Sequence, residues 1–378
     1  MNSFLYVSFL DENLWSGYKM KIHSQVKAVS KLGYKSYLFI INANKVRLYE
    51  IHDNEEKILF DKKSTFKRFS NKRNIFDEFF LFNLFCKELL EVIDYLDPHI
   101  VYFRRIVPIT PKLINTIKAI KKKNIKIFYE YPTFPWEKEY IAEKKYLFYI
   151  LDRIQFKILK NQITKLVTVG TKQGQYPEYI NISNAIDVST ISKRNPIQHT
   201  GFNMIGVANV NIFHGFDRVV VGLKNYYQDN PSLKVYFHIV GDVREDTGLK
   251  ELVKICGLNS YVIFHGYKSG KDLDLLFDYA DVAIGCLGVH RKDVNSLNSL
   301  KNREYTARGI PFVFSEHDEA IEKKAPDFIY KPSFDDSPID INEIIKFCST
   351  VQSTPDEIRN FAIKYLNWES EMRKILIT

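Results

Sequence analysis

The chain has 378 residues, of which 45% are hydrophobic and 26% charged. This composition is typical of a globular protein and excludes a low-complexity or disordered chain. The length predicts about two domains, each large enough for its own core. No window of about 20 residues is free of charge, so we expect no transmembrane helix, and the N-terminus lacks the basic start of a signal peptide.

The formal net charge of +9 is spread unevenly, since residues 1–200 carry +13 and residues 201–378 carry −4. A basic first half indicates either an anionic partner, such as a membrane surface, a lipid pyrophosphate or nucleic acid, or a lysine-rich solvated surface. No recognised nucleic-acid-binding motif accompanies the charge, so we expect no nucleic-acid partner. The four cysteines lack CxxC spacing, which argues against a zinc site and favours reduced thiols in a cytoplasmic protein.

In the first half of the chain, apolar runs alternate with segments of helical spacing. The expected strands are Phe4–Leu10, Tyr37–Ile41, His99–Phe103, Ile125–Glu130 and Lys165–Val169. The expected helices are Tyr18–Leu32, Pro111–Lys123 and Glu143–Lys160. Residues 42–74 are polar and lysine-rich, and we expect a hairpin or loop there.

The expected helix Glu143–Lys160 combines apolar and basic residues. Its apolar residues recur at helical spacing and include Leu147, Ile150, Leu151, Ile154 and Ile158, with Arg153 and Lys157 among the basic ones. Such a helix either docks on anionic lipid or packs its apolar face on the sheet.

The second half repeats the alternation. Its expected strands are Phe202–Ala208, Val235–Val240, Val262–His265, Val282–Gly285 and Phe312–Phe314. Its expected helices are Phe216–Asp229, Gly248–Cys256, Lys271–Asp278, Lys301–Arg308 and Ile341–Thr350, with a terminal helix over Thr354–Ile377.

Strands that alternate with helices predict parallel sheets, so we expect an α/β protein with two Rossmann-like domains facing across a cleft. The first domain is expected over residues 1–190 and the second over 200–354, joined by the polar stretch Asn181–Thr200. Residues 355–378 are expected to return to the first domain. Ligands of such sheets bind beyond the carboxyl ends of the strands, so the loops that follow strands are the candidate sites.

Several common motifs are absent. The chain has no GxGxxG after its first strand, no GxxxxGK[ST] and no GxSxG. This argues against a dinucleotide dehydrogenase, a P-loop enzyme and an α/β-hydrolase.

The most informative segment is SLKNREYTARGIPFVFS, from Ser299 to Ser315. A polar loop leads into a helix that Gly309 and Pro311 end, and an apolar strand follows. Lys301 and Glu304 lie three residues apart on one helical face, beside a helix N-terminus that attracts anions. This pattern is typical either of a nucleotide-sugar site, with cations for the diphosphate and a carboxylate for the ribose, or of a surface Lys–Glu pair.

Three other loops carry residues suited to phosphates. Ser16-Gly17 follows the first strand and lets a ligand approach the backbone. His214 and Arg218 lie at the start of the helix after Phe202–Ala208, where Arg218 either clamps a diphosphate or pairs with an acid. The segment His290-Arg291-Lys292 places positive charge just before the Ser299 segment.

The strand Ile125–Glu130 leads into the Pro-rich aromatic loop YPTFPWEKE. Tyr131, Phe134 and Trp136 could stack on pyranose rings while Glu130 holds hydroxyls. Alternatively, the two prolines stiffen a buried turn.

In order and spacing, these motifs resemble those of GT-B glycosyltransferases, in particular glycosyltransferase family 4 members of bacterial capsule and exopolysaccharide synthesis. The carrying residues are Glu304, Ala307, Gly309 and Pro311, with the segments HGFDR, FYEYPTFPWEKE and NISNAID. The family usually has a second glutamate eight positions before Glu304, where this chain has Ser296.

The resemblance implies a retaining transfer of a sugar from a nucleotide-diphosphate sugar, UDP- or GDP-linked, to a glycan or lipid-linked acceptor at the inner membrane face, without a metal or other cofactor. The implied ribose ligand is Glu304, and the implied catalytic residues are Glu130 and His290. The implied diphosphate ligands are Gly17, His214, Arg218, Arg291, Ser299 and Lys301. Tyr131, Phe134 and Trp136 are implied to face the acceptor. A nucleotide-sugar 2-epimerase and a non-catalytic binding partner remain the alternatives, the latter because of Ser296.

Overall fold

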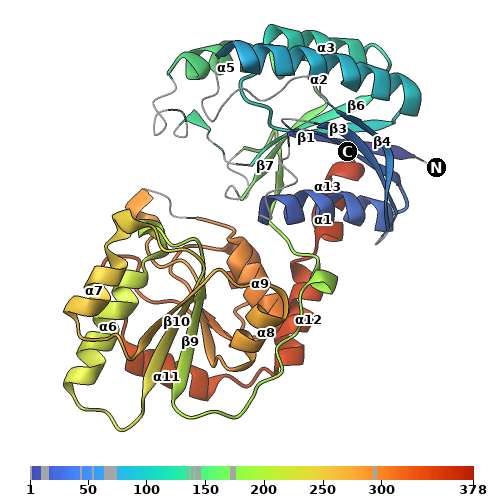
Figure 1. Ribbon diagram of the computed structural model, residues 1–378. Helices are drawn as coiled ribbons and strands as arrows, with labels where there is room; N and C mark the ends of the chain where they lie inside the picture. The colour runs from blue at the N-terminus through green and yellow to red at the C-terminus, as the bar shows by residue number, and fades with distance from the viewer. Residues whose placement is uncertain are drawn as a thin grey trace. The chain divides into compact units, whose positions relative to one another are not determined.

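The structure is a computed structural model that describes residues 2–9, 17–42, 45–52, 55–63, 75–132, 134, 136–137, 140, 146–170, 176–292 and 296–378. The chain divides into two compact units. Unit 1 comprises Met1–Ser183 with Trp368–Thr378, and unit 2 comprises Asn184–Asn367 (Figure 1). The predicted α/β class with two Rossmann-like parallel-sheet domains is confirmed.

Unit 1 is built on an eight-stranded sheet in the order β4-β3-β2-β1-β5-β6-β7-β8. Its strands are β1 (Ser3–Phe9), β2 (Lys35–Asn42), β3 (Lys45–His52), β4 (Glu55–Lys63), β5 (Ile100–Arg104), β6 (Lys126–Tyr131), β7 (Lys165–Val169) and β8 (Ile180–Ile182). The pairs β2–β3 and β3–β4 are antiparallel. Strands β3 and β4 form a hairpin at the edge of the sheet, which is one of the two possibilities expected for residues 42–74.

Helices cover both faces of this sheet (Figure 1). On one face lie α2 (Ile75–Leu96), α3 (Pro111–Lys121) and α5 (Tyr146–Leu159), and on the other lie α1 (Gly17–Lys31) and α13 (Trp368–Leu376). The sequence patterns did not predict α2, β8 or the separate strands β3 and β4.

Unit 2 has a six-stranded, wholly parallel sheet in the order β11-β10-β9-β12-β13-β14. Its strands are β9 (Phe202–Val207), β10 (Val235–Val240), β11 (Val262–Gly266), β12 (Val282–Ile284), β13 (Phe312–Val313) and β14 (Ile329–Tyr330). The chain moves outward from β9 in one direction and returns to β12 on its other side, so the topological switch point lies between β9 and β12.

The helices of unit 2 form two groups on either side of the sheet (Figure 1). One group is α6 (Phe216–Gln228), α7 (Leu249–Ile255) and α11 (Ile341–Thr350), and the other is α8 (Gly270–Asp278), α9 (Leu300–Arg308) and α12 (Pro355–Tyr365), with the short α10 (Glu319–Glu322) between β13 and β14. Ser299 caps the start of α9, and Gly309 ends it in the left-handed conformation at φ 77°, as the sequence indicates.

The C-terminal segment is divided between the two units. The sequence predicts one helix over Thr354–Ile377 that returns as a whole to the first domain. In the structure α12 packs on α9 within unit 2, and only α13, after Asn367, packs on α1 within unit 1. Thr354 and Glu357 form a capping box that fixes where α12 begins.

Candidate functional site: an anion site at the switch point of unit 2

Two loops meet beyond the carboxyl ends of β9 and β12. Gly215 lies between the short helix Ile212–His214 and α6 with φ 65°, and a Cβ there would come within 2.7 Å of Gly288 N and of Leu287 C. The amides of Leu287 and Gly288 donate to the carbonyls of His214 and Phe213 at 2.9 and 3.1 Å. The two glycines therefore serve loop packing, and the backbone amide of Gly288 is used within the protein.

His214 and Lys301 are brought together at this junction. Lys301 Nζ lies 2.9 Å from His214 Nε2, although the two residues are 87 positions apart. The His214 ring is 3% exposed, and burial together with the charge of Lys301 lowers its pKa to about 3. The ring is therefore neutral at pH 7.

The tautomer of His214 follows from its other nitrogen. The backbone N–H of Asn211 donates to Nδ1 at 3.0 Å, so the proton of the neutral ring sits on Nε2. Nε2–H and the Lys301 ammonium are therefore both donors, and they face each other at 2.9 Å. An anionic oxygen at this point would accept from both.

Lys292 adds a second cation to the site. Its ammonium lies 3.3 Å from the centre of the Phe213 ring, next to His214, and its charge contributes to the lowered pKa of His214. Within the described part of the chain, neither Lys292 nor Lys301 forms an ion pair with a carboxylate. Ser299 is buried, and its Oγ accepts from the amide of Lys301 at 3.3 Å as the cap of α9. The cluster therefore carries uncompensated positive charge beside a helix N-terminus.

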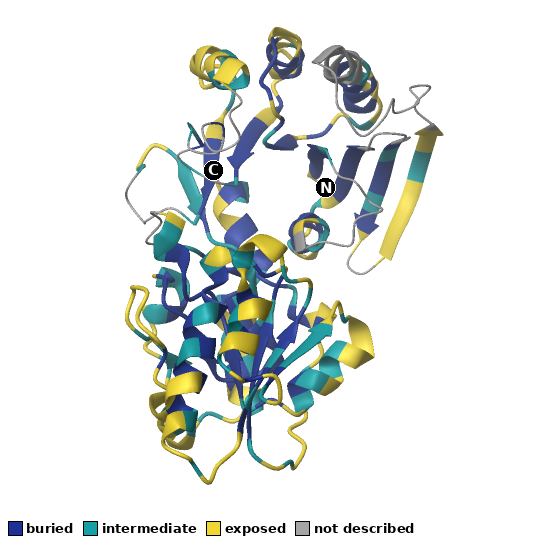
Figure 2. Ribbon diagram, turned by 60° about the vertical axis from the view of Figure 1, so that its left-hand side comes forward, coloured by how far each residue is buried: buried dark blue, intermediate teal, exposed yellow. Residues whose placement is uncertain are grey.

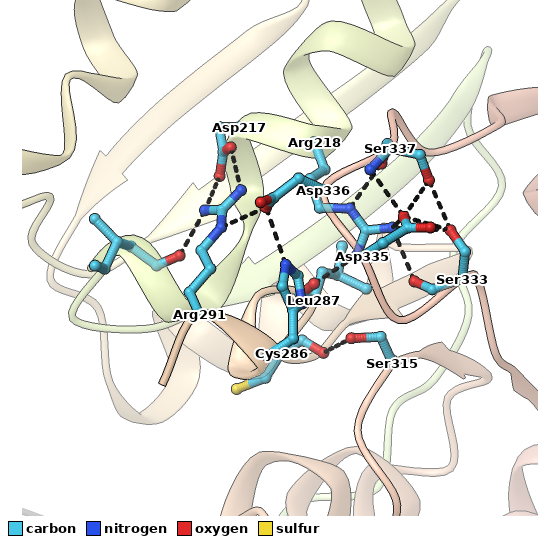
Figure 3. A network of polar contacts seen from close by, with 12 residues as sticks. Asp217, Arg218, Cys286, Leu287, Arg291, Ser315, Ser333, Asp335, Asp336 and Ser337 are labelled. Carbon is cyan, nitrogen blue, oxygen red and sulfur yellow. Dashed lines mark hydrogen bonds and ion pairs between the residues drawn. The ribbon is translucent and has the colours of Figure 1, made fainter. Parts of the chain in front are cut away.

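Arg218 is engaged with backbone carbonyls. The side chain is 1% exposed, and its guanidinium donates to the carbonyls of Leu287, Ser333 and Ser337 at 2.5, 3.0 and 2.7 Å (Figure 3). It ties the loop after β12 to the loop after β14. Three of its N–H groups are directed at these carbonyls, and its expected role as a phosphate ligand stays a prediction.

Arg291 is likewise engaged with protein groups. It holds Asp217 in a bidentate pair at 2.9 and 2.7 Å and donates through Nε to Asp336 at 2.7 Å (Figure 3). These carboxylates raise its pKa and neutralise its charge. The structure places Arg291 in an ion-pair cluster rather than in the anion site.

His290, an expected catalytic residue, belongs to the same cluster. Its Nε2 lies 3.0 Å from Asp336 Oδ1. Its Nδ1 is buried and has no hydrogen-bond partner among the described residues. The polar contact of His290 is thus with the Asp336 loop and not with Lys301.

Glu304 and Lys301 do not pair with each other. Glu304 Oε1 instead accepts from Arg308 Nε at 2.9 Å, and Arg308 also donates to Asp274 at 2.7 Å. The Glu304 side chain is 25% exposed. Arg308 therefore holds Glu304 through Oε1, and both residues lie on α9, the helix that also carries Lys301.

A buried polar network behind α9 escaped the sequence analysis. Arg303 and Asp318, both 0% exposed, form a bidentate pair in which the second bond measures 2.9 Å, and Asn298 also donates to Asp318. Glu316 is 0% exposed, and Asn302 Nδ2 reaches its Oε1 at 3.3 Å while Oε2 has no partner in the described part of the chain. Burial, with Asp318 nearby, raises the pKa of Glu316 to about 7. The one sequence signal for Glu316 is its place three residues after the buried strand β13.

Glu130 in unit 1 is locked in the interior. The carboxylate is 0% exposed and accepts from Arg104 at 2.6 Å, Lys21 at 3.2 Å, Tyr102 at 2.7 Å and Gln25 at 3.1 Å. Although burial opposes ionisation, these cations and hydrogen bonds lower its pKa to about 2. A carboxylate with this pKa and these four donors is not a proton acceptor near neutral pH, which corrects its assignment as a catalytic residue.

The aromatic loop after β6 packs inward. Tyr131 and Trp136 are 0% and 1% exposed and surround the guanidinium of Arg105 at 5.1 and 5.4 Å. Phe134 is half-buried against Tyr131, with ring centroids 6.0 Å apart. Tyr131 points away from Glu130 because neighbouring residues of a strand face opposite sides. The first two rings are therefore core residues and present no face to a sugar.

The small pair expected to close over the diphosphate is partly described. Gly17 begins α1, while Ser16 lies outside the described residues. The predicted contact of Gly17 with the diphosphate therefore stays a prediction.

Comparison with solved structures decides the fold. No family model and no curated protein matches the chain. A glycosyltransferase from Rickettsia africae is 16% identical with a TM-score of 0.63, covering 100% of this chain and 97% of that one. The sucrose-phosphate synthase of Thermosynechococcus elongatus is 12% identical with a TM-score of 0.65, covering 100% and 98%. The Anabaena protein HepE, in complex with UDP, is 11% identical with a TM-score of 0.61, covering 99% and 98%.

The chain has the GT-B fold. In this GT-B chain the candidate anion site of unit 2 lies in the loops after β9 and β12 and at the start of α9. No helix in the described part of the chain is long and apolar enough to cross a membrane, and the described residues include no group of three or more His, Cys, Asp or Glu side chains arranged to hold a metal ion.

Proposed function

We propose that this GT-B protein is a retaining glycosyltransferase that moves a sugar from a UDP- or GDP-sugar to a glycan or lipid-linked oligosaccharide in surface polysaccharide synthesis. The observation that carries the proposal is the 2.9 Å contact between Lys301 Nζ and His214 Nε2. It brings two donors to one point, and the diphosphate of a donor sugar supplies an acceptor for both. Two of the similar structures hold UDP, which favours a nucleotide donor.

In the proposed reaction the bond between the anomeric carbon of the sugar and the diphosphate oxygen breaks, and a bond from that carbon to the acceptor hydroxyl oxygen forms on the same face. The hydroxyl proton passes to the leaving diphosphate, on which negative charge develops. Lys301, Lys292 and the Nε2–H of His214 stabilise this charge, aided by the N-terminus of α9. Because protein groups supply the positive charge, we propose that the transfer is independent of a metal. Glu304, held by Arg308 through Oε1, is proposed to accept the ribose hydroxyls through its other oxygen.

Donor binding and transfer test the proposal. Calorimetric titration with UDP, GDP and a panel of their sugars is compared between the natural protein, Lys301→Ala and Lys346→Ala. Lys346 serves as the control because it is 72% exposed on α11. We expect Lys301→Ala to weaken binding by about 10- to 100-fold, the usual effect of losing a hydrogen bond to a charged group, and Lys346→Ala to leave it unchanged. Equal affinities for all three proteins would reject the site.

The non-catalytic alternative rests on Ser296. The serine stands where the family usually has a glutamate, and its Oγ donates to the carbonyl of His317 at 3.1 Å. Donor binding without turnover, with any acceptor tried, would favour a binding partner.

Sugar isomers formed without an acceptor would favour a 2-epimerase. Transfer that persists in a metal chelator is the outcome expected for the proposed enzyme.

A further inference from the structure

The outer face of α5 is apolar and exposed. Five large hydrophobic side chains on this helix are 38–74% exposed, namely Tyr146, Leu147, Ile150, Ile154 and Ile158. Spacings of three and four residues align the last four in one stripe along the helix. This apolar stripe is Leu147, Ile150, Ile154 and Ile158. In Figure 2 the helix at the upper left, corresponding to α5 in Figure 1, is coloured largely as exposed.

The opposite face of α5 is firmly anchored, so the stripe cannot turn inward. Asp152 is 0% exposed and accepts from the amide of Ile109 and from the hydroxyl of Tyr140, each at 2.5 Å. Leu159 is 0% exposed in the core, and Phe156 contacts Tyr131 with ring centroids 5.5 Å apart. The helix thus satisfies its contacts to unit 1 and still presents a row of apolar side chains outward.

Basic side chains flank the stripe on one side. Arg153, Lys157 and Lys160 are exposed and follow one another at spacings of four and three residues. Asp152 is the only acid of α5, and it is buried. The neighbouring helix α3 adds the exposed Lys112, Lys118 and Lys121. The exposed surface of α5 therefore combines apolar and positively charged groups without a negative one.

We propose that α5 docks unit 1 onto an anionic lipid bilayer, with the apolar stripe in the interface and the basic flank on the headgroups. An amphipathic helix that lies in the membrane plane needs an apolar face and flanking Lys or Arg, and its affinity combines apolar burial with attraction to anionic lipid. Charge complementarity favours an anionic lipid surface, because Arg153, Lys157 and Lys160 flank the stripe and the only acid of α5 is buried.

The test is co-sedimentation of the full chain, without nucleotide sugar, with vesicles of phosphatidylcholine alone or of phosphatidylcholine mixed with the anionic lipid phosphatidylglycerol. We expect binding to the anionic vesicles that weakens as salt rises. Leu147→Ser with Ile154→Ser is expected to lower the partition coefficient by about tenfold or more. Arg153→Gln with Lys157→Gln is expected to lower it by about fivefold per charge.

The matched control is Ile255→Ser with Leu275→Ser, two side chains of unit 2 that are 74% and 50% exposed and lie outside α5. This control is expected to bind as the natural protein does. Thermal unfolding of each variant checks that the fold persists, which we expect because all the changed side chains are exposed. Unchanged vesicle binding by the α5 variants would overturn the proposal. The proposal would also be overturned if light scattering showed that the natural protein is a dimer and that the double variant Leu147→Ser with Ile154→Ser is a monomer.

Discussion

At the residue scale, Glu130 is where chemistry and stability are most easily confused. Glu130→Gln keeps the shape of the side chain but leaves Lys21 and Arg104, 6% and 6% exposed, without their counter-ion. Breaking a buried ion pair from one side costs about 3–5 kcal/mol of unfolding free energy. We expect urea unfolding of Glu130→Gln to show a loss of unfolding free energy of this size. The control is Glu343→Gln, which changes a carboxylate that is 48% exposed and is expected to cost almost nothing.

A second substitution separates the two roles of Glu130. Adding Lys21→Met to Glu130→Gln removes one of the two uncompensated cations and is expected to restore part of the lost stability. If Glu130→Gln unfolded like the natural protein and lost only sugar transfer, the carboxylate would be catalytic after all.

Glu316 gives a pH dependence of opposite sign to that of an ordinary paired acid. Its pKa rises from 4.5 to about 7 in the folded chain, so the unfolded chain loses this proton first as pH rises. Below pH 4.5 both states hold the proton and no difference arises. Between pH 4.5 and 7 the unfolding free energy therefore falls, by about 3 kcal/mol when complete.

Glu316→Gln mimics the protonated form and is expected to be more stable than the natural protein at pH 8 and similar at pH 4.5. Urea unfolding at several pH values measures the difference. Parallel stability curves for the two proteins would show that Glu316 ionises normally.

At the element scale, the two loops of the anion site depend on Gly215. Alanine at Gly215 would meet both a left-handed backbone and the backbone of Leu287 and Gly288 at 2.7 Å. Gly257 is the matched control, because it has φ 69° but open space around its Cβ position. We expect Gly257→Ala to cost about 1–2 kcal/mol, the cost of the left-handed conformation alone, and Gly215→Ala to cost clearly more in thermal unfolding.

Donor affinity gives an independent reading of the same pair. Gly215→Ala displaces the loop that carries His214 and is expected to weaken nucleotide binding, whereas Gly257→Ala is not. Equal melting temperatures for both variants would mean that the loops can separate without cost.

The same elements show what sequence patterns can and cannot predict. Buried parallel strands and helix caps are local signals, so β9, α9 and the Gly309 stop were predictable from the residues themselves. The partners of a charged side chain are not local. Arg218 binds carbonyls more than a hundred positions away at Ser333 and Ser337, and nothing near it in the sequence distinguishes this from a phosphate contact.

Lys301 and His214 illustrate the opposite outcome. Both follow parallel strands, and the carboxyl ends of such strands share one edge of the sheet, so their meeting was predictable from topology.

The failure of the sequence patterns to predict α2 also has a physical reason. The helix α2 contains the run FFLFNLF, in which six of seven residues are apolar, so the sequence there shows no helical alternation of apolar and polar residues.

At the scale of the whole molecule, unit 1 is closed by a segment that arrives after unit 2 is complete. Trp368, Met372 and Ile375 of α13 are 2%, 0% and 0% exposed, and Glu371 accepts from the amide of Ser183 at 2.8 Å. Unit 2 is a continuous segment with a separate core. Separate cores predict two unfolding transitions in calorimetry.

Removal of residues 368–378 tests this assembly. Each buried large side chain that is lost from a core costs about 2–5 kcal/mol, so the truncated chain is expected to lose or strongly lower the transition of unit 1. The transition of unit 2 should stay where it was, because α12 and its contacts to α9 remain. Removal of Ile377 and Thr378 alone, with Ile377 79% exposed, is the control and should move neither transition. A common shift of both transitions on removal of 368–378 would mean that the two units unfold as one cooperative body.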